Sequence, residues 1–211
     1  MQASHCQSCA GGPRMLAGFG CGTMLAEIVA GNLFGRQDRE GAQVPFFRRS
    51  KERKHDMTQV AVEVHRQIRS SIHTAVEGLS AEQLHEMPDG FDNNIAWNLG
   101  HIMVVQQRIL YGSSGLPLSV SEAMIPLYLP NTSPADWQTA PDAEALVAML
   151  MPQQEQLEAD FAAGRFSENE FSVFTTRSGL ALGDLDATLT FNIYHESQHY
   201  GFILALINLV G

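Results

Sequence analysis

The sequence lacks cysteine over most of its length. All three cysteines of the 211-residue chain lie in its first 56 residues, at Cys6, Cys9 and Cys21. Residues 57–211 therefore have no disulfide framework and no thiol nucleophile of their own, which fits a reducing compartment, and we expect a cytoplasmic protein. The single Cys-x-x-Cys pair near His5 has no second pair, so it is a weak signal for a metal site.

Basic residues are also scarce after the first 56 residues. Residues 57–211 contain five arginines, no lysine and 18 acidic residues, a net charge of −13, whereas residues 1–56 carry +3. A surface that acidic repels phosphate backbones, so we expect no nucleic-acid partner. Solubility accounts for most of these acidic side chains.

Residues 1–56 lack any sustained periodic pattern and are rich in glycine. The stretch Met15–Gly35 is long enough to cross a membrane, but Glu27 and five glycines weaken its apolar character, so we expect no membrane segment. We interpret residues 1–56 as a disordered tail, or as a segment that is not translated because Met57 is the true start. Native peptides from upstream of residue 50 would contradict the second interpretation.

Apolar residues at helical spacing predict an all-α fold for residues 57–211. Asp92 or Asn93 is the expected cap of the second helix, and Asp184 or Asp186 that of the fourth. Pro152 should kink or interrupt the third helix. The four expected helices cover residues 58–79, 93–111, 142–163 and 185–209.

Two further segments complete the expected architecture. Residues 112–141 contain five prolines and predict a long crossover between the second and third helices. Residues 171–176 and 180–182 flank a turn and predict a small hairpin before the fourth helix. The sequence thus predicts a four-helix bundle with one long crossover.

Three histidines are the strongest chemical signal. His195 and His199 are four residues apart, so they lie on one face of the last helix, where two imidazoles can share one metal ion. His101 lies on a largely apolar side of the second helix. Each histidine alone would more often be a hydrogen-bonded core residue. Three on two helices that face one core favour a metal site, and three ligands leave coordination positions open.

The stretch His195-Glu196-Ser197-Gln198-His199 also matches the H-E-x-x-H pattern of zinc peptidases. Those enzymes usually take a third ligand downstream, and residues 200–211 contain no His, Asp or Glu. The longer form of the motif would need a histidine where Ala205 stands. We therefore do not expect a peptidase, although an upstream third ligand would still satisfy the shorter motif.

Three stretches resemble the DinB-like superfamily of metal-binding four-helix bundles. They are NIAWNLGH at residues 94–101, HESQHYG at residues 195–201, and the crossover around residues 124–134. The resemblance covers most of residues 57–211. It implies a long crossover, one metal ion held by three histidines and, in many members, a homodimer. By position the implied ligands are His101, His195 and His199.

The resemblance also bears on chemistry. Family members of known activity include thiol-dependent transferases and isomerases, so a low-molecular-weight thiol is an expected cosubstrate. Zinc suits three imidazoles, and nickel, iron or manganese are alternatives. The family commonly has Gln after the glycine of the last helix, where this chain has Phe202, which makes that part of the site more apolar.

Several neighbours are candidates for supporting roles. Asn98 and Asn192 are each three residues from a proposed ligand, so they could line the cavity or orient a ligand, or could serve only as caps or hydrogen-bond partners in the bundle. Glu196 is the candidate catalytic base, with a solvated flank as the alternative. Arg108 and Arg177 are the candidate anchors for an anionic cosubstrate. His65 is expected at the edge of the first helix, as a distant fourth candidate ligand.

These observations favour a metal-dependent enzyme, either a thiol-dependent transferase or a hydrolase, acting on a small molecule. A non-catalytic metal-binding or ligand-binding bundle in a stress response is the first alternative. A purely structural bundle with packed histidines is the second. The sequence does not decide between them.

Overall fold

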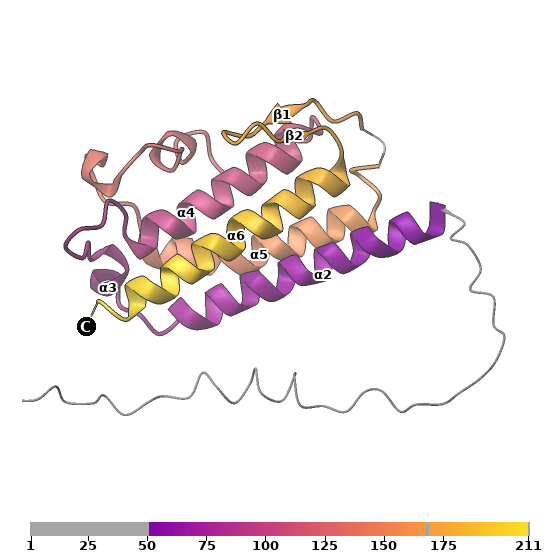
Figure 1. The fold of residues 1–211 in the computed structure, drawn as a ribbon. Coiled ribbons are helices and arrows are strands. Elements are labelled where there is room, and N and C mark those ends of the chain that lie inside the picture. Colours follow the sequence, from indigo (N-terminus) through magenta and orange to yellow (C-terminus); the bar gives the residue numbers. More distant parts are fainter. Residues whose placement is uncertain (1–50, 168, 211) are drawn as a thin grey trace, which may run out of the picture. The chain divides into compact units, whose positions relative to one another are not determined.

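Four long helices run alongside one another in the computed structural model, which describes residues 51–167 and 169–210, with side chains from Met57 onward (Figure 1). They are α2 (Lys51–Val76), α4 (Ile95–Gln106), α5 (Ala143–Ala162) and α6 (Leu185–Ile207). The short helical segments are α3 (Ala81–His85), η1 (Gln107–Gly112), η2 (Ile125–Leu127) and η3 (Pro134–Asp136). The predicted all-α four-helix bundle is confirmed. The interpretation of residues 1–56 lies outside the described residues as far as residue 50, and residues 51–56 are helical instead of disordered.

Side-chain caps fix where three of the long helices begin. The Oδ1 atoms of Asn94, Asp142 and Asp184 accept hydrogen bonds at 2.8, 3.0 and 2.8 Å from main-chain N–H groups in the first turns of α4, α5 and α6. These N–H groups have no partner inside the helix, so each cap stabilises its helix by about 1 kcal/mol.

The observed boundaries differ from the predicted ones in detail. The cap of α4 is Asn94 rather than Asp92 or Asn93, because it is the Asn94 side chain that reaches the first-turn N–H. Helix α2 begins at Lys51 instead of residue 58 and ends at Val76. Helix α5 continues through Pro152 without interruption.

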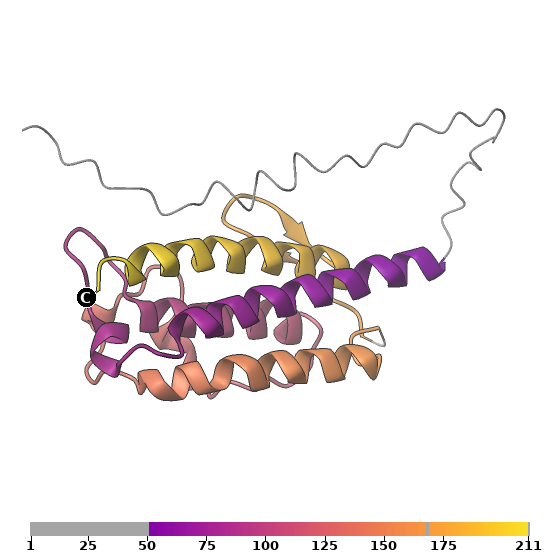
Figure 2. The same cartoon turned by 90° about the horizontal axis from the view of Figure 1, so that it is seen from below.

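In cross-section the four long helices occupy the corners of a square. Helices α2 and α4 are at opposite corners, and each packs against both α5 and α6. Figure 2 shows α2 between α5 and α6, with α4 behind it. Every residue of α4 except Val105 is buried, which agrees with its apolar character on all sides. After Gln106 the helix widens into the single π turn η1.

The interior consists of two apolar layers separated by a polar one. The first apolar layer includes Ile72, Leu99 and Leu150, and the second includes Ile109 and Leu157. Along each long helix, buried polar side chains lie between the residues of the two layers. We call this set the polar layer, and its members are His65, Arg69, Gln106, Gln153, Gln154, Asn192 and Glu196.

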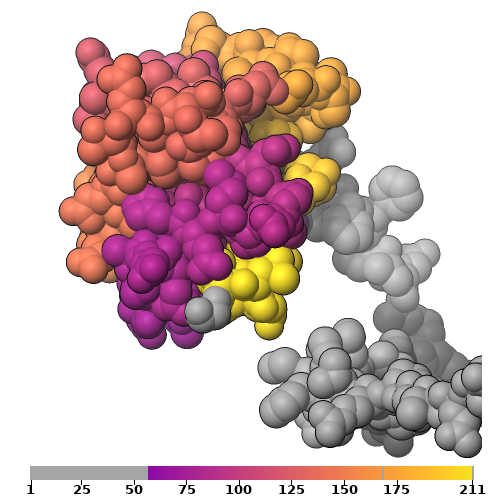
Figure 3. All heavy atoms as spheres, turned by 90° about the vertical axis from the view of Figure 1, so that its left-hand side faces the viewer, coloured from indigo at the N-terminus to yellow at the C-terminus, as the bar shows by residue number. Residues whose placement is uncertain are grey.

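The crossover between η1 and α5, residues 113–142, begins near the segment before the hairpin, where Ser113 O accepts from Ser172 N, and its later part lies at the α3 end of the bundle (Figure 3). Ser133 Oγ donates a hydrogen bond to the carbonyl oxygen of Asp92 at 2.8 Å, and Nε2 of His85 donates to that of Pro141 at 2.9 Å. Both contacts tie the crossover to the connection between α2 and α4. The crossover thereby places Tyr128, which is fully buried, against α4.

A small antiparallel hairpin precedes α6, as predicted. Its strands are β1 (Phe174–Thr175) and β2 (Ala181–Leu182), with Phe174 opposite Leu182. The intervening turn carries Arg177 and Ser178. Among the described residues, no helix combines the length and the apolar character needed to cross a membrane.

Candidate metal centre

The structure brings His101 of α4 together with His195 and His199 of α6. One ring nitrogen from each lies within 4.8 Å of the other two. The Nε2 atoms of His101 and His195 are 3.2 Å apart. Because α4 and α6 pack side by side and His195 and His199 are one turn apart, the three imidazoles meet at one point.

Hydrogen bonds set the tautomers of two of these rings. Nδ1 of His101 is 2.7 Å from the main-chain oxygen of Tyr128, and Nδ1 of His199 is 2.7 Å from Oδ1 of Asn98. Both oxygens only accept, so each Nδ1 carries the proton and each Nε2 keeps its lone pair. Asn98 Nδ2 donates to the carbonyl oxygen of Asn94 at 2.7 Å, which fixes the orientation of the Asn98 amide. A metal-binding histidine is commonly held in this way.

The Nε2 atoms of His101 and His195 face each other at 3.2 Å. Since Nε2 of His101 is unprotonated, Nε2 of His195 donates a hydrogen bond to it. A metal ion at the Nε2 atoms would move that proton to Nδ1 of His195, which is buried and, among the described residues, has no hydrogen-bond partner. Three neutral imidazoles are then the ligands, a donor set that a divalent ion accepts.

The protonation states also suit metal binding. Burial, together with a smaller effect of the neighbouring histidines, lowers the pKa of His195 to about 4 and that of His199 to about 3. Burial also lowers the pKa of His101, against the opposing effect of its bond to Tyr128. The three rings are therefore neutral near pH 7, and their lone pairs are available for a metal ion.

Two aromatic residues hold the ligand rings from the sides. Trp97 stacks on His101 with ring centroids 4.5 Å apart and planes inclined by 15°. Phe191 lies nearly parallel to His195 at 6.0 Å and 22°. These contacts restrict the ring orientations, so the site is organised before any ligand binds.

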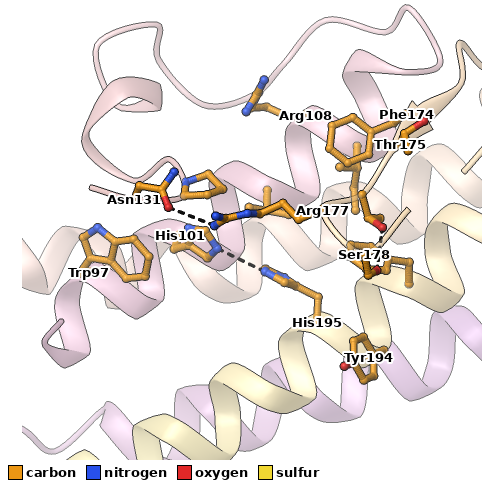
Figure 4. A pocket seen from close by; sticks show the side chains of 15 residues that line it. Trp97, His101, Arg108, Asn131, Phe174, Thr175, Arg177, Ser178, Tyr194 and His195 are labelled. Atoms are coloured by element: carbon orange, nitrogen blue, oxygen red, sulfur yellow. Dashed lines mark hydrogen bonds between the residues drawn. The ribbon is translucent and has the colours of Figure 1, made fainter. Parts of the chain in front are cut away.

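A cavity of about 480 Å³ opens beside His101 and His195 (Figure 4). Helix α4, η1, α6, the crossover and the hairpin all contribute to its walls. Its lining is mostly aromatic or aliphatic, with Arg108 and Arg177 as the cations and no Asp or Glu. Figure 4 shows His101 and His195 facing each other, with Arg177 extending toward Asn131. A small molecule in this cavity would lie next to His101 and His195.

Glu196 lies elsewhere, in the polar layer. It is fully buried, its Oε2 accepts from Arg69 Nε at 2.7 Å, and its Oε1 accepts from Arg69 Nη2 at 2.5 Å. Burial raises the pKa of Glu196, but the charge of Arg69 and the contacts with His65 outweigh it and hold the pKa far below its usual range. The expected solvated flank is wrong. The ion pair also argues against Glu196 as a general base, because it makes the carboxylate a very weak one.

His65 differs from expectation, and Asn192 follows one of the two roles left open for it. His65 is fully buried, with Nδ1 2.6 Å from Oε1 of Gln154, instead of lying at the helix edge. Asn192 Nδ2 is 2.6 Å from Nε2 of His65 and 3.0 Å from Oε1 of Glu196. Asn192 is thus a hydrogen-bond partner within the polar layer, whereas Asn98 hydrogen-bonds to His199.

The sequence of α2 contains a signal for the polar layer. The buried positions of α2 follow the alternating three- and four-residue spacing of a helix core. They are Thr58, Val62, His65, Arg69, Ile72 and Val76. His65 and Arg69 occupy core positions in this register, and burial of such groups requires partners on the neighbouring helices.

Comparison with known proteins gives a family match and a similar solved structure. The sequence profile of the DinB superfamily matches residues 65–203. A solved structure similar to the chain is YfiT from Bacillus subtilis, described as a probable metal-dependent hydrolase with an unusual four-helix bundle topology. It is 18% identical, with a TM-score of 0.44 over 79% of this chain and 93% of its own. No curated protein matches the sequence.

Proposed function

Since the chain belongs to the DinB superfamily, we propose that it is an enzyme that depends on one divalent metal ion bound by His101, His195 and His199. The observation that carries the proposal is the convergence of three neutral imidazoles beside a cavity large enough for a small molecule. Zinc is the proposed metal, with nickel, iron or manganese as alternatives.

The proposed reaction is a hydrolysis or the transfer of a low-molecular-weight thiol. A divalent ion with three imidazole ligands retains open coordination positions and supplies Lewis-acid activation of a water molecule or a thiol. The chain's own residues would then position the substrate. Trp97 and Phe191 hold the ligand rings, and the apolar lining excludes water from the reacting groups.

One observation favours a second candidate, a non-catalytic bundle that binds a metal or a small ligand in a stress response. None of the residues that line the cavity is acidic, and the carboxylate of Glu196 is occupied by Arg69. A hydrolase commonly needs a general base near the attacking water, and the described lining offers no carboxylate for that role.

Elemental mass spectrometry tests the metal site. The full-length protein, purified without nickel affinity, should contain about one metal ion per chain. His101→Ala and His199→Ala should lose it. His73→Ala is the matched control, since His73 is partly exposed on α2 and distant in sequence from the cluster. A wild type that remains metal-free after incubation with zinc, nickel, iron and manganese would refute the proposal.

Activity then separates the two candidates. The metal-loaded protein should hydrolyse or thiolate a member of a small-molecule panel, and His199→Ala should not. A protein that binds its metal but is inactive across the panel favours the non-catalytic bundle. We also propose that the protein acts as a homodimer on a small molecule and not on nucleic acid, which light scattering and a nucleic-acid binding assay test directly.

A further inference from the structure

Two arginines line the cavity beside the histidines, and they come from different parts of the chain. Arg108 belongs to η1, and Arg177 belongs to the turn between β1 and β2. In Figure 4, Arg177 extends across the cavity toward Asn131, and Arg108 lies above it in the view. Helix and hairpin thus each supply one cation to the same cavity.

These arginines differ from the other three in residues 57–211. Arg66 pairs with Glu158 at 2.6 Å, Arg165 pairs with Asp160 at 2.6 Å, and Arg69 pairs with Glu196. Within the described part of the chain, neither Arg108 nor Arg177 has a carboxylate within ion-pair distance. Residues 57–211 contain 18 acidic residues and five arginines. The two arginines that have no acidic partner among the described residues, Arg108 and Arg177, both line the same cavity.

The rest of the cavity suits the apolar part of a ligand. Trp97, Ile109, Phe174 and Phe191 contribute aromatic and aliphatic surface. Arg177 Nη1 donates to Asn131 Oδ1 at 3.0 Å, which orients the guanidinium and leaves its other N–H groups available. Both arginines are exposed, and a guanidinium presents paired donors that match the geometry of a carboxylate.

We propose that the cavity binds an amphipathic carboxylic acid, with its carboxylate at Arg108 and Arg177 and its apolar part against the aromatic lining. Its reacting group would then lie toward His101 and His195. This inference rests on the proposed function and names the class of its substrate. The cavity volume, about 480 Å³, lies in the range of small-molecule sites, roughly 300–1,000 Å³.

Calorimetry with two probes of equal size tests the anion subsite. The full-length, metal-free protein is titrated with 4-phenylbutyrate and with its uncharged amide, 4-phenylbutanamide. Omission of the metal ensures that a carboxylate preference arises from the arginines. The wild type should bind the acid about tenfold more tightly than the amide. In the double variant Arg108→Gln/Arg177→Gln that preference should fall below about threefold.

The control is Arg66→Gln, which removes an outer, half-exposed arginine and should keep the full preference. Equal affinity of both probes, a preference that survives in the double variant, or no binding of either probe would overturn the subsite. Reloading the same variants with zinc and measuring the bound metal separates this outcome from failure of the metal site. The arginine variants should still bind zinc, and His199→Ala should still prefer the acid.

Discussion

The main-chain oxygen of Tyr128 accepts a hydrogen bond from Nδ1 of His101 at 2.7 Å, and the ring of the same tyrosine covers Gly100, the residue before that histidine. A Cβ atom at position 100 would overlap the tyrosine ring, and Tyr128 is fully buried, so the ring has little room to move. The orientation of His101 therefore depends on how closely the crossover approaches α4.

Gly100→Ala should weaken both the fold and the metal site. Displacement of Tyr128 should lower the free energy of unfolding by about 1–3 kcal/mol, as overfilling a packed core usually does. Loss of the Tyr128 contact to His101 should weaken zinc binding by about tenfold. Urea unfolding and zinc titration against a chromogenic chelator measure the two effects.

Gly201→Ala is the matched control for that experiment. Gly201 lies on the exposed side of α6, and a Cβ atom there would meet nothing within 4 Å. Alanine should leave zinc affinity unchanged and increase stability by up to about 1 kcal/mol. If Gly100→Ala behaves like this control, the crossover does not position His101.

Asn98→Ala should weaken zinc binding by about 10- to 100-fold. Asn98 Oδ1 is the acceptor that keeps the proton of His199 on Nδ1 and directs Nε2 toward the other two histidines. Asn208→Ala is the control, because Asn208 is the exposed C-cap residue of the helix that carries His199, and its side chain donates to the main-chain oxygen of Leu204. An affinity that is the same in both variants would show that Asn98 does not orient His199.

The helices and the three histidines were predictable from the sequence because both depend on local spacing. Apolar periodicity gives the helices, and a four-residue interval places His195 and His199 on one face whatever surrounds them. His101 required the further argument that two apolar faces share one core. The proposed metal-binding role of the three residues stays a prediction until metal content is measured.

The polar layer was not predictable to the same degree, because it depends on partners from four helices. The sequence places Glu196 next to His195. Only the folded bundle shows that its carboxylate forms an ion pair with Arg69, which is 127 residues away in the sequence. The cap of α4 differs by one position for a similar reason, since Asp92, Asn93 and Asn94 have equivalent capping chemistry and only the backbone geometry selects among them.

Removal of Glu196 alone should destabilise the protein strongly. Glu196→Gln leaves the buried charge of Arg69 without its partner, which typically costs about 3–5 kcal/mol. Replacement of both partners by apolar residues, Arg69→Met with Glu196→Leu, should be much less damaging than either single change. Urea unfolding of the two single variants and the double variant measures this difference.

The double variant also tests the predicted base. Glu196 does not line the cavity, so the folded double variant should bind metal as the wild type does and retain activity on any substrate that the wild type turns over. Abolished activity together with full metal content would restore Glu196 as a candidate catalytic residue.

Stability of the metal-free protein should fall as the pH is lowered from 7 to 5. Burial lowers the pKa of His195 to about 4, while the unfolded chain has the ordinary value of 6.5. The unfolded state therefore binds more protons below pH 6.5, so the contribution of His195 is complete above that pH and is lost as the pH falls toward 4. Between pH 7 and 5 this residue alone should account for about 2 kcal/mol.

Chemical unfolding in the presence of a chelator at pH 7, 6 and 5 measures that dependence. His195→Gln should make the pH profile less steep, because glutamine does not titrate, while His101 and His199 keep their own contributions. Carboxyl groups contribute little in this interval because most of them titrate below pH 5. Stability that rises on acidification would mean that the folded site favours a charged imidazole, which contradicts the neutral rings that metal binding requires.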